Sequence, residues 1–259
     1  MAGESELDVL AIGPHPDDLE ILCGGTLAKL VNLGQRVAML DLTTGEPTPR
    51  GSLEIRAREA EAARQALGVP LRINLGLPNR ELMDIPVNRY ALATQLRKLR
   101  PQIVIAAFGR TPAASPDHYQ GQLLIEAARF YSQLTKWDER FGGLPPYRVP
   151  HLVYVPFPFD AEQRLWQGSF IIDISDTFAK KVEAIRCYES QFDGERFEKV
   201  QHVLGGQNAS TGARCGFRYG EFFALPVPVG ADNLVTLVKG GKGSPAPVQL
   251  PGRDHLPLA

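Results

Sequence analysis

The tetrapeptide His15-Pro16-Asp17-Asp18 brings an imidazole and two carboxylates together within a short stretch of chain. His15 and Asp18 offer nitrogen and oxygen ligands of the kind that bind zinc in hydrolytic enzymes. Asp17 lies between them, close enough to touch a water at the same ion without being a ligand itself. There it can act as a general base and take a proton from water whose pKa the metal lowers to about 7. The arrangement is typical of a metal hydrolase.

A hydrolytic zinc site needs three protein ligands and one open position. The best source of the third ligand is Pro116-Asp117-His118, which stands at the start of another predicted helix. His151, His202 and His255 are weaker candidates, since they lie at a strand start, in a polar stretch and near the C-terminus. Both motifs also have a purely structural interpretation, because aspartate is a good N-cap residue. From the residues alone, metal binding and helix capping are both open.

Strand and helix patterns alternate along the first half of the chain and decide where the two motifs lie. Apolar runs predict strands, and apolar residues at helical spacing predict helices. The predicted strands are 7–12, 36–42, 71–75 and 103–108, and the predicted helices are 18–33, 53–67, 88–99 and 120–134. This order predicts a Rossmann-like α/β fold, a mostly parallel sheet with helices on both faces. Both motifs then follow strands at the carboxyl edge of the sheet, where ligands collect.

The second half of the chain is less regular. We expect strands at 152–156 and 169–174, a helix from about 177 to 190 and a glycine-rich connection at 205–216. A single domain is predicted over 1–225, followed by a Pro- and Gly-rich tail, 226–259, that is loosely ordered or packs against a partner subunit. Cys23-Gly24-Gly25-Thr26 does not match the dinucleotide pattern GxGxxG and falls inside a predicted helix. We expect its glycines to allow close approach of a strand or another subunit.

Composition excludes several classes of protein. The 259 residues carry a formal net charge of −1, which gives no basis for binding nucleic acid or an anionic membrane. No apolar run approaches the roughly 18 residues of a membrane-spanning helix, and the acidic start of the chain does not have the form of an export signal. The three cysteines, Cys23, Cys187 and Cys215, form no disulfide or metal pattern. We therefore expect reduced thiols and a cytoplasmic location.

Several motifs resemble, in order, those of the PIG-L/LmbE deacetylases, and the resemblance covers roughly residues 7–225. They are Gly13-Pro14-His15-Pro16-Asp17-Asp18, Cys23-Gly24-Gly25-Thr26, Leu75-Gly76-Leu77-Pro78-Asn79, Pro116-Asp117-His118, Tyr188-Glu189-Ser190-Gln191-Phe192 and Arg218-Tyr219-Gly220-Glu221-Phe222-Phe223. The resemblance implies a zinc-dependent hydrolase that removes acetyl groups from N-acetylglucosamine conjugates. The last two motifs look most like the bacillithiol-biosynthesis branch, which deacetylates N-acetylglucosaminyl-malate. Related proteins form homo-oligomers, so a homo-oligomer is expected here, with a small sugar conjugate as the partner in the reaction.

The resemblance also implies roles for individual residues. His15, Asp18 and His118 become the zinc ligands, and Asp17 becomes the general base. Arg56, in a predicted helix, would contact substrate hydroxyls or the tetrahedral intermediate.

Other residues are expected around this centre. Asp117 would orient a neighbouring imidazole or fix its loop, and it also remains a candidate helix cap. Glu46, in the loop after the second strand, is placed to line the pocket, and Tyr188 is expected near the substrate. The two carboxylates of a malate glycoside need cationic partners, and the candidates at this edge are Arg56, Arg80 and Arg110.

Ser115 departs from the family pattern, which is usually His-Pro-Asp-His where this chain has Ser-Pro-Asp-His. The resemblance implies that a histidine there acts as an acid or as a partner of the oxyanion, and one oxyanion donor is worth ~2.7–4 kcal/mol. Three outcomes are open. Zinc and Arg56 suffice at a lower rate; Tyr119, Tyr188 or another side chain substitutes; or catalysis is lost while metal and ligand binding remain. The alternative functions are therefore a deacetylase or amidase of the same family that acts on another sugar conjugate, or a catalytically weakened zinc-binding relative.

Overall fold

A computed structural model describes residues 7–109, 114–157, 168–228 and 230. These residues form a seven-stranded sheet with the strand order β3-β2-β1-β4-β5-β7-β6. The strands are β1 (Val9–Gly13), β2 (Val37–Thr43), β3 (Leu71–Leu77), β4 (Ile103–Phe108), β5 (His151–Pro156), β6 (Ser169–Asp173) and β7 (Gly220–Ala224). The first five strands pair in parallel, whereas β7 is antiparallel to β5 and to β6. The predicted fold class, a mostly parallel α/β sheet, is confirmed.

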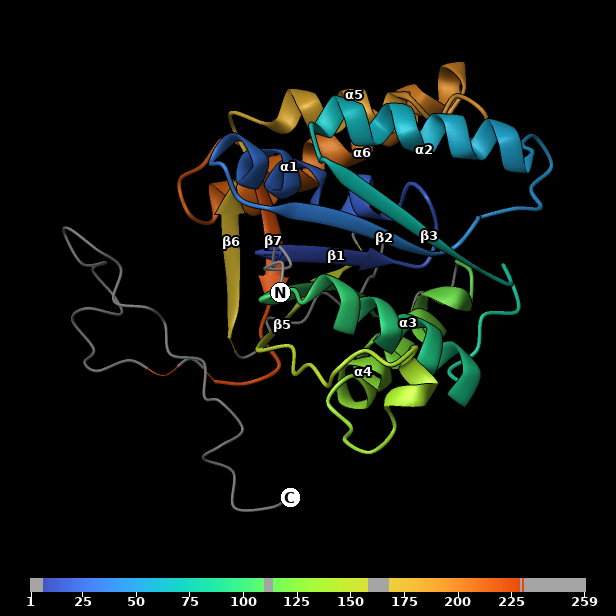
Figure 1. Cartoon of the computed structure of the whole chain (residues 1–259). Helices are drawn as coiled ribbons and strands as arrows, with labels where there is room; N and C mark the ends of the chain where they lie inside the picture. Colours follow the sequence, from blue (N-terminus) through green and yellow to red (C-terminus); the bar gives the residue numbers. More distant parts are fainter. Residues whose placement is uncertain (1–6, 110–113, 158–167, 229, 231–259) are drawn as a thin grey trace.

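Helices cover both faces of the sheet (Figure 1). Helices α1 (Asp18–Asn32), α2 (Leu53–Leu67), α5 (Phe178–Arg186) and α6 (Gly194–Ala213) lie on one side, and α3 (Pro86–Leu99) and α4 (Asp117–Tyr131) lie on the other. A 3-10 turn, η1 (Asp138–Phe141), follows α4. Alternate residues of each strand enter different cores, as Ala11 and Met39 show on one face and Leu10 and Leu40 on the other. Because both faces are buried, β1 and β4 are apolar along their whole length.

Local signals define α2 sharply, and α2 begins and ends where the sequence predicts. The side chain of Ser52 accepts a hydrogen bond from the backbone N–H of Ile55, which caps the start of the helix. Gly68 ends the helix with a left-handed backbone at φ 76°. This helix carries Arg56 to the carboxyl edge of the sheet.

The segment 205–216 corrects the prediction of a glycine-rich connection, because most of it belongs to α6. Two adjacent glycines, Gly205 and Gly206, weaken a helix by roughly 1 kcal/mol each relative to alanine, and this weakness misled the sequence interpretation. Tertiary packing outweighs it. A Cβ atom on Gly212 would lie 2.7 Å from the backbone carbon of Tyr219, so glycine lets α6 press against the start of β7. The side chain of Asn208 also donates to the carbonyl of Gly220.

Two other helices differ in extent from the prediction. The helix expected to end at 190 stops at Arg186, and the chain continues in turns. Helix α4 starts at Asp117, three residues earlier than expected, so His118 lies in its first turn.

Helix α1 is broken at Cys23, where the backbone has φ −142° and ψ 18°. Gly25 follows the break, and a Cβ atom there would lie 2.8 Å from Cδ1 of Ile174, in the segment between β6 and α5. The close approach expected of Gly24-Gly25 is therefore made by Gly25 with a segment of the same chain.

The proposed division into a domain and a tail stays a prediction, because residue 229 and residues 231–259 lie outside the described part of the chain. None of the described helices is long and apolar enough to cross a membrane. The predicted cytoplasmic location and homo-oligomer also stay predictions.

Candidate metal centre and active site

The turn after β1 shapes the first motif. The backbone N–H of Asp18 donates to the carbonyl of His15 over 3.2 Å, and Asp18 Oδ2 accepts the backbone N–H of His15 over 2.9 Å. These reciprocal bonds fold His15 and Asp18 onto each other at the start of α1. Asp17 takes φ 115°, a backbone conformation that costs a non-glycine residue about 1–3 kcal/mol and that often marks a functional site.

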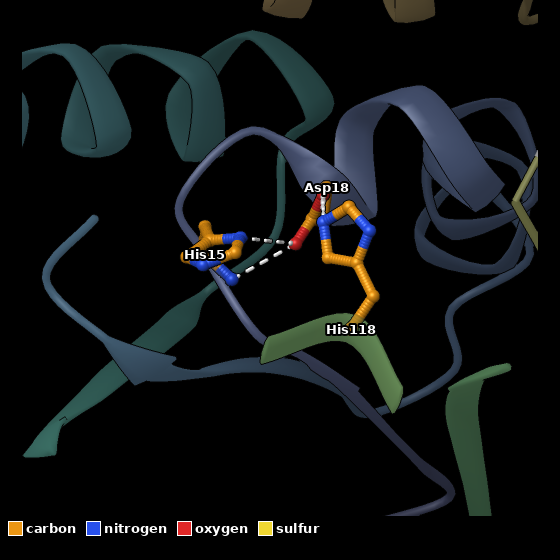
Figure 2. A group of neighbouring side chains, drawn as sticks. All are labelled: His15, Asp18 and His118. Carbon is orange, nitrogen blue, oxygen red and sulfur yellow. Dashed lines mark hydrogen bonds and ion pairs between the residues drawn. The ribbon is translucent and has the colours of Figure 1, made fainter. Parts of the chain in front are cut away.

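His118 reaches the same place from α4. Strands β1 and β4 are parallel neighbours, so the helices that follow them begin at the same edge of the sheet. Nε2 of His118 lies 3.5 Å from Oδ1 of Asp18. One ligand atom each from His15, Asp18 and His118 lies within 4.8 Å of the other two (Figure 2). The ring of His118 stacks on Phe157, with 4.0 Å between the ring centroids, which limits its rotation.

His15 is held between two carboxylates. Its Nδ1 lies 3.1 Å from Oδ2 of Asp18, and its Nε2 lies 3.2 Å from Oδ2 of Asp117. Burial lowers the pKa of His15, but its bonds to Asp117 and Asp18 outweigh burial and raise the pKa to about 10. For Asp18, burial raises the pKa and the bond to His15 opposes it, so that the pKa is lowered. Burial lowers the pKa of His118. His15 and Asp18 therefore stabilise each other's charged forms, whereas burial favours the neutral form of His118.

The side chains present fit a zinc ion. Two imidazoles and one carboxylate form a donor set of the hydrolytic type. Asp117 faces the second nitrogen of the His15 ring, which is the outer-shell partner that a metal-bound histidine usually has. Asp117 is itself fixed, since its Oδ2 also accepts the backbone N–H of Arg80 over 2.6 Å.

Asp17 lies next to the cluster and is paired with Arg56 of α2. Nη2 of Arg56 donates to Oδ2 of Asp17 over 3.0 Å and to the carbonyl of Pro16 over 2.6 Å. Within the described residues, the other carboxylate oxygen of Asp17 has no hydrogen-bond partner. Burial raises the pKa of Asp17, the charge of Arg56 opposes this, and the resulting pKa is about 7. A carboxylate with a pKa near neutrality is well suited to accept and return a proton.

Arg56 is backed by a buried polar network that the sequence interpretation missed. Its guanidinium lies 5.4 Å from the centroid of the Tyr188 ring. The hydroxyl of Tyr188 donates to Oε1 of Glu20 over 3.0 Å, and Arg72 bonds the same oxygen over 2.5 Å. Arg72 also makes two bonds to Asp41. The signal for this network was visible, because Asp41 interrupts an otherwise apolar strand and buried charges are found in pairs.

The remaining predicted substrate residues have different environments. Tyr188 has no exposed surface and its hydroxyl is bonded to Glu20, so we correct its expected place: it lies behind Arg56 and not against a substrate. The carboxylate of Glu46 accepts from the backbone N–H and the hydroxyl of Thr48, which orders the loop after β2. Arg110 lies outside the described residues.

Ser115 stands where the family pattern has histidine, and its side chain makes a local hydrogen bond just before α4. The Ser115 hydroxyl oxygen accepts the backbone N–H of Asp117 over 3.3 Å at the start of α4. Of the two tyrosines considered as substitutes for that histidine, Tyr188 is buried and Tyr119 is 42% exposed.

The fold and this cluster define an α/β protein with a candidate hydrolytic metal centre. A family model described as PIG-L, GlcNAc-PI de-N-acetylase, matches residues 10–128. A diacetylchitobiose deacetylase from Thermococcus kodakarensis is 31% identical over 224 residues, which cover 82% of this chain and 80% of that protein. A 4-oxalmesaconate hydratase from Pseudomonas putida is 27% identical over 201 residues, which cover 70% and 73%. The crystal structure of a conserved protein from Thermus thermophilus has a TM-score of 0.75 and 35% identity, and covers 87% of this chain and 97% of that one.

The chain belongs to the PIG-L family. The predicted resemblance is confirmed at this level, and so is the prediction of an enzyme of the deacetylase class. The bacillithiol branch stays a prediction.

Proposed function

We propose that this protein removes the acetyl group from an N-acetylglucosamine conjugate by zinc-dependent amide hydrolysis. The observation that carries the proposal is the convergence of His15, Asp18 and His118, with Asp17 beside them and paired to Arg56. The similarity to a diacetylchitobiose deacetylase over most of both chains supports the reaction class.

In this proposal, His15, Asp18 and His118 hold zinc, which would polarise the acetyl carbonyl and acidify water. Asp17 accepts the proton of the attacking water on the oxygen that Arg56 leaves free. It then returns this proton to the amine nitrogen as the C–N bond breaks, so the carboxylate serves as base and then as acid. Arg56 holds Asp17 in place during both transfers and offsets its charge. Asp117 keeps the ring of His15 oriented.

Ser115 has a neutral hydroxyl, so it supplies no positive charge to a developing oxyanion. The proton cycle above does not need a histidine at this position, because Asp17 supplies the acid. We therefore propose an active enzyme in which replacement of Ser115 by histidine changes the rate without creating the activity.

For the substrate, we propose N-acetylglucosaminyl-malate, on the Tyr188-Glu189-Ser190-Gln191-Phe192 and Arg218-Tyr219-Gly220-Glu221-Phe222-Phe223 motifs. In the structure, a residue of the first motif binds the helix that carries Arg56. Ser190 donates through its backbone N–H and its hydroxyl to Glu59 of α2, one helical turn from Arg56. The second candidate is another conjugate of the same sugar, such as a neutral inositol glycoside. Its aglycone lacks carboxylates, which distinguishes it in an assay.

The deciding experiment measures amine release from N-acetylglucosaminyl-malate by zinc-loaded protein, with metal-stripped protein as the control. Asp17→Asn should still bind about one zinc per chain and should lose turnover, because an amide cannot take the proton. Near-normal activity of that variant would rule out Asp17 as the base. No release from any N-acetylglucosamine conjugate by zinc-loaded wild type would refute the proposed reaction and favour a weakened relative or a hydration reaction like that named for the Pseudomonas putida relative.

A further inference from the structure

The charge of Arg56 is already matched inside the site. Arg56 is buried, and its Nη2 is bonded to Asp17 and to the carbonyl of Pro16. Its Nε and Nη1 are enclosed as well, and have no hydrogen-bond partner among the described residues. The Arg56 cation is therefore already paired with the carboxylate of Asp17.

Arg80 differs from Arg56 in its exposure and in the pairing of its guanidinium. Its side chain is exposed, and within the described residues its guanidinium makes no hydrogen bond or ion pair. Its backbone lies at the centre of the site, because Oδ2 of Asp117 accepts the N–H of Arg80 over 2.6 Å and contacts Nε2 of His15 over 3.2 Å. One carboxylate oxygen thus separates the Arg80 backbone from the His15 ring.

The backbone of Arg80 is left-handed, with φ 66°. Glycine and asparagine adopt this conformation more easily than other residues. The backbone conformation of this turn therefore does not by itself favour an arginine. Glu81, its exposed neighbour, has no ion-pair partner in the described part of the chain and provides a matched control for charge.

We infer that Arg80 is a specificity-determining residue that binds a carboxylate on the aglycone of the substrate. This inference rests on the proposed function, and it adds that the enzyme prefers an anionic conjugate over a neutral one. The Arg80 backbone is bonded to Asp117 beside His15, so its exposed side chain is anchored at the edge of the site. In this inference, the aglycone of a substrate whose acetyl group is at the metal centre comes within reach of that side chain. A charge-assisted, two-point bond of this kind favours arginine over lysine.

The test compares N-acetylglucosaminyl-malate with its uncharged dimethyl ester as substrates of the zinc-loaded enzyme. The readout is the ratio of the two kcat/KM values. Wild type should have the higher kcat/KM for the diacid. Arg80→Asn should lower the ratio of diacid to diester kcat/KM roughly tenfold, through a higher KM for the diacid. Asparagine is chosen because it removes the charge and keeps the left-handed turn. The ratio for Arg80→Lys should lie between those of wild type and Arg80→Asn. Glu81→Gln should leave the ratio unchanged or raise it.

The outcomes distinguish a failure of the Arg80 inference from a failure of the proposed function. An Arg80→Asn variant that loses activity equally on both substrates would overturn the inference, because Arg80 would then act only by holding Asp117. An unchanged ratio in that variant would overturn it as well. Release of no amine from either substrate by wild type would overturn the malate conjugate as the substrate and the inference with it, whereas the proposed reaction would be refuted only by the same result with every N-acetylglucosamine conjugate. A preference of wild type for the diacid that weakens with added salt would support the inference, since salt screens an exposed charge pair.

Discussion

The buried pair of Lys181 and Glu221 offers a sharp test of how the fold is held together. Lys181 of α5 donates to Oε1 of Glu221 of β7 over 2.6 Å, and each side chain is 1% exposed. The same carboxylate accepts the backbone N–H groups of Gly25 and Thr26, over 3.0 and 2.8 Å. These two N–H groups follow the break in α1 at Cys23, so Glu221 joins three elements and caps the second half of α1.

Glu221→Gln should be the most damaging single change. It leaves the ammonium of Lys181 buried without a counter-charge and directs an NH₂ group toward other donors. Breaking a buried pair in this way lowers the free energy of unfolding by about 3–5 kcal/mol. Lys181→Met should cost less, because Glu221 keeps its two backbone bonds. The double variant should cost less than the two single changes added together, by up to about 3 kcal/mol.

Urea unfolding followed by circular dichroism measures these differences as shifts of the midpoint at constant slope. With a slope of about 3 kcal/mol/M, Glu221→Gln should move the midpoint down by about 1–1.7 M. Glu183→Gln removes an exposed partner of Arg186 and should change stability by less than about 0.5 kcal/mol. A Glu221→Gln midpoint equal to that of this control, or strictly additive single variants, would refute the reasoning.

Three further outcomes are expected. Asp117→Asn should weaken zinc binding about 10- to 100-fold in a chelator-competition titration, because the ring of His15 loses its anionic partner; unchanged affinity would contradict this. Tyr188→Phe should lower the free energy of unfolding by about 1.5–3 kcal/mol, since a hydrogen bond to the buried carboxylate of Glu20 is lost; an unchanged urea midpoint would refute it. Gly25→Ala should destabilise by about 1–3 kcal/mol in the same assay, because its Cβ overlaps a packed side chain; wild-type stability would disprove the close packing.

Much of the candidate site was predictable because its signals are local. The cluster of His15, Asp18 and His118 combines two short motifs with the rule that parallel strands end at the same edge of a sheet. The ends of α2 were readable for the same reason, since Ser52 and Gly68 act on the backbone groups next to them. Such features depend on a few neighbouring residues and on the strand order that alternating elements impose.

The contacts that support the site could not be predicted, because they join residues far apart in the chain. Tyr188 was expected near the substrate, yet it is buried against Glu20, 168 residues away. The segment 205–216 resembles a connection in sequence, and the packing of Gly212 against the start of β7 is what favours a helix there.

The sequence by itself determined the fold class, the candidate metal-binding motifs and the family, because hydrophobic period, turn residues and motif spacing are encoded locally. Only the tertiary structure decided which charges are paired and which, among the described residues, are free. Arg56 is neutralised by Asp17, Lys181 by Glu221, and Arg72 by two carboxylates, while the guanidinium of Arg80 stays exposed. The physical reason is that a buried charge needs a partner, and packing across the whole chain decides which side chain provides it.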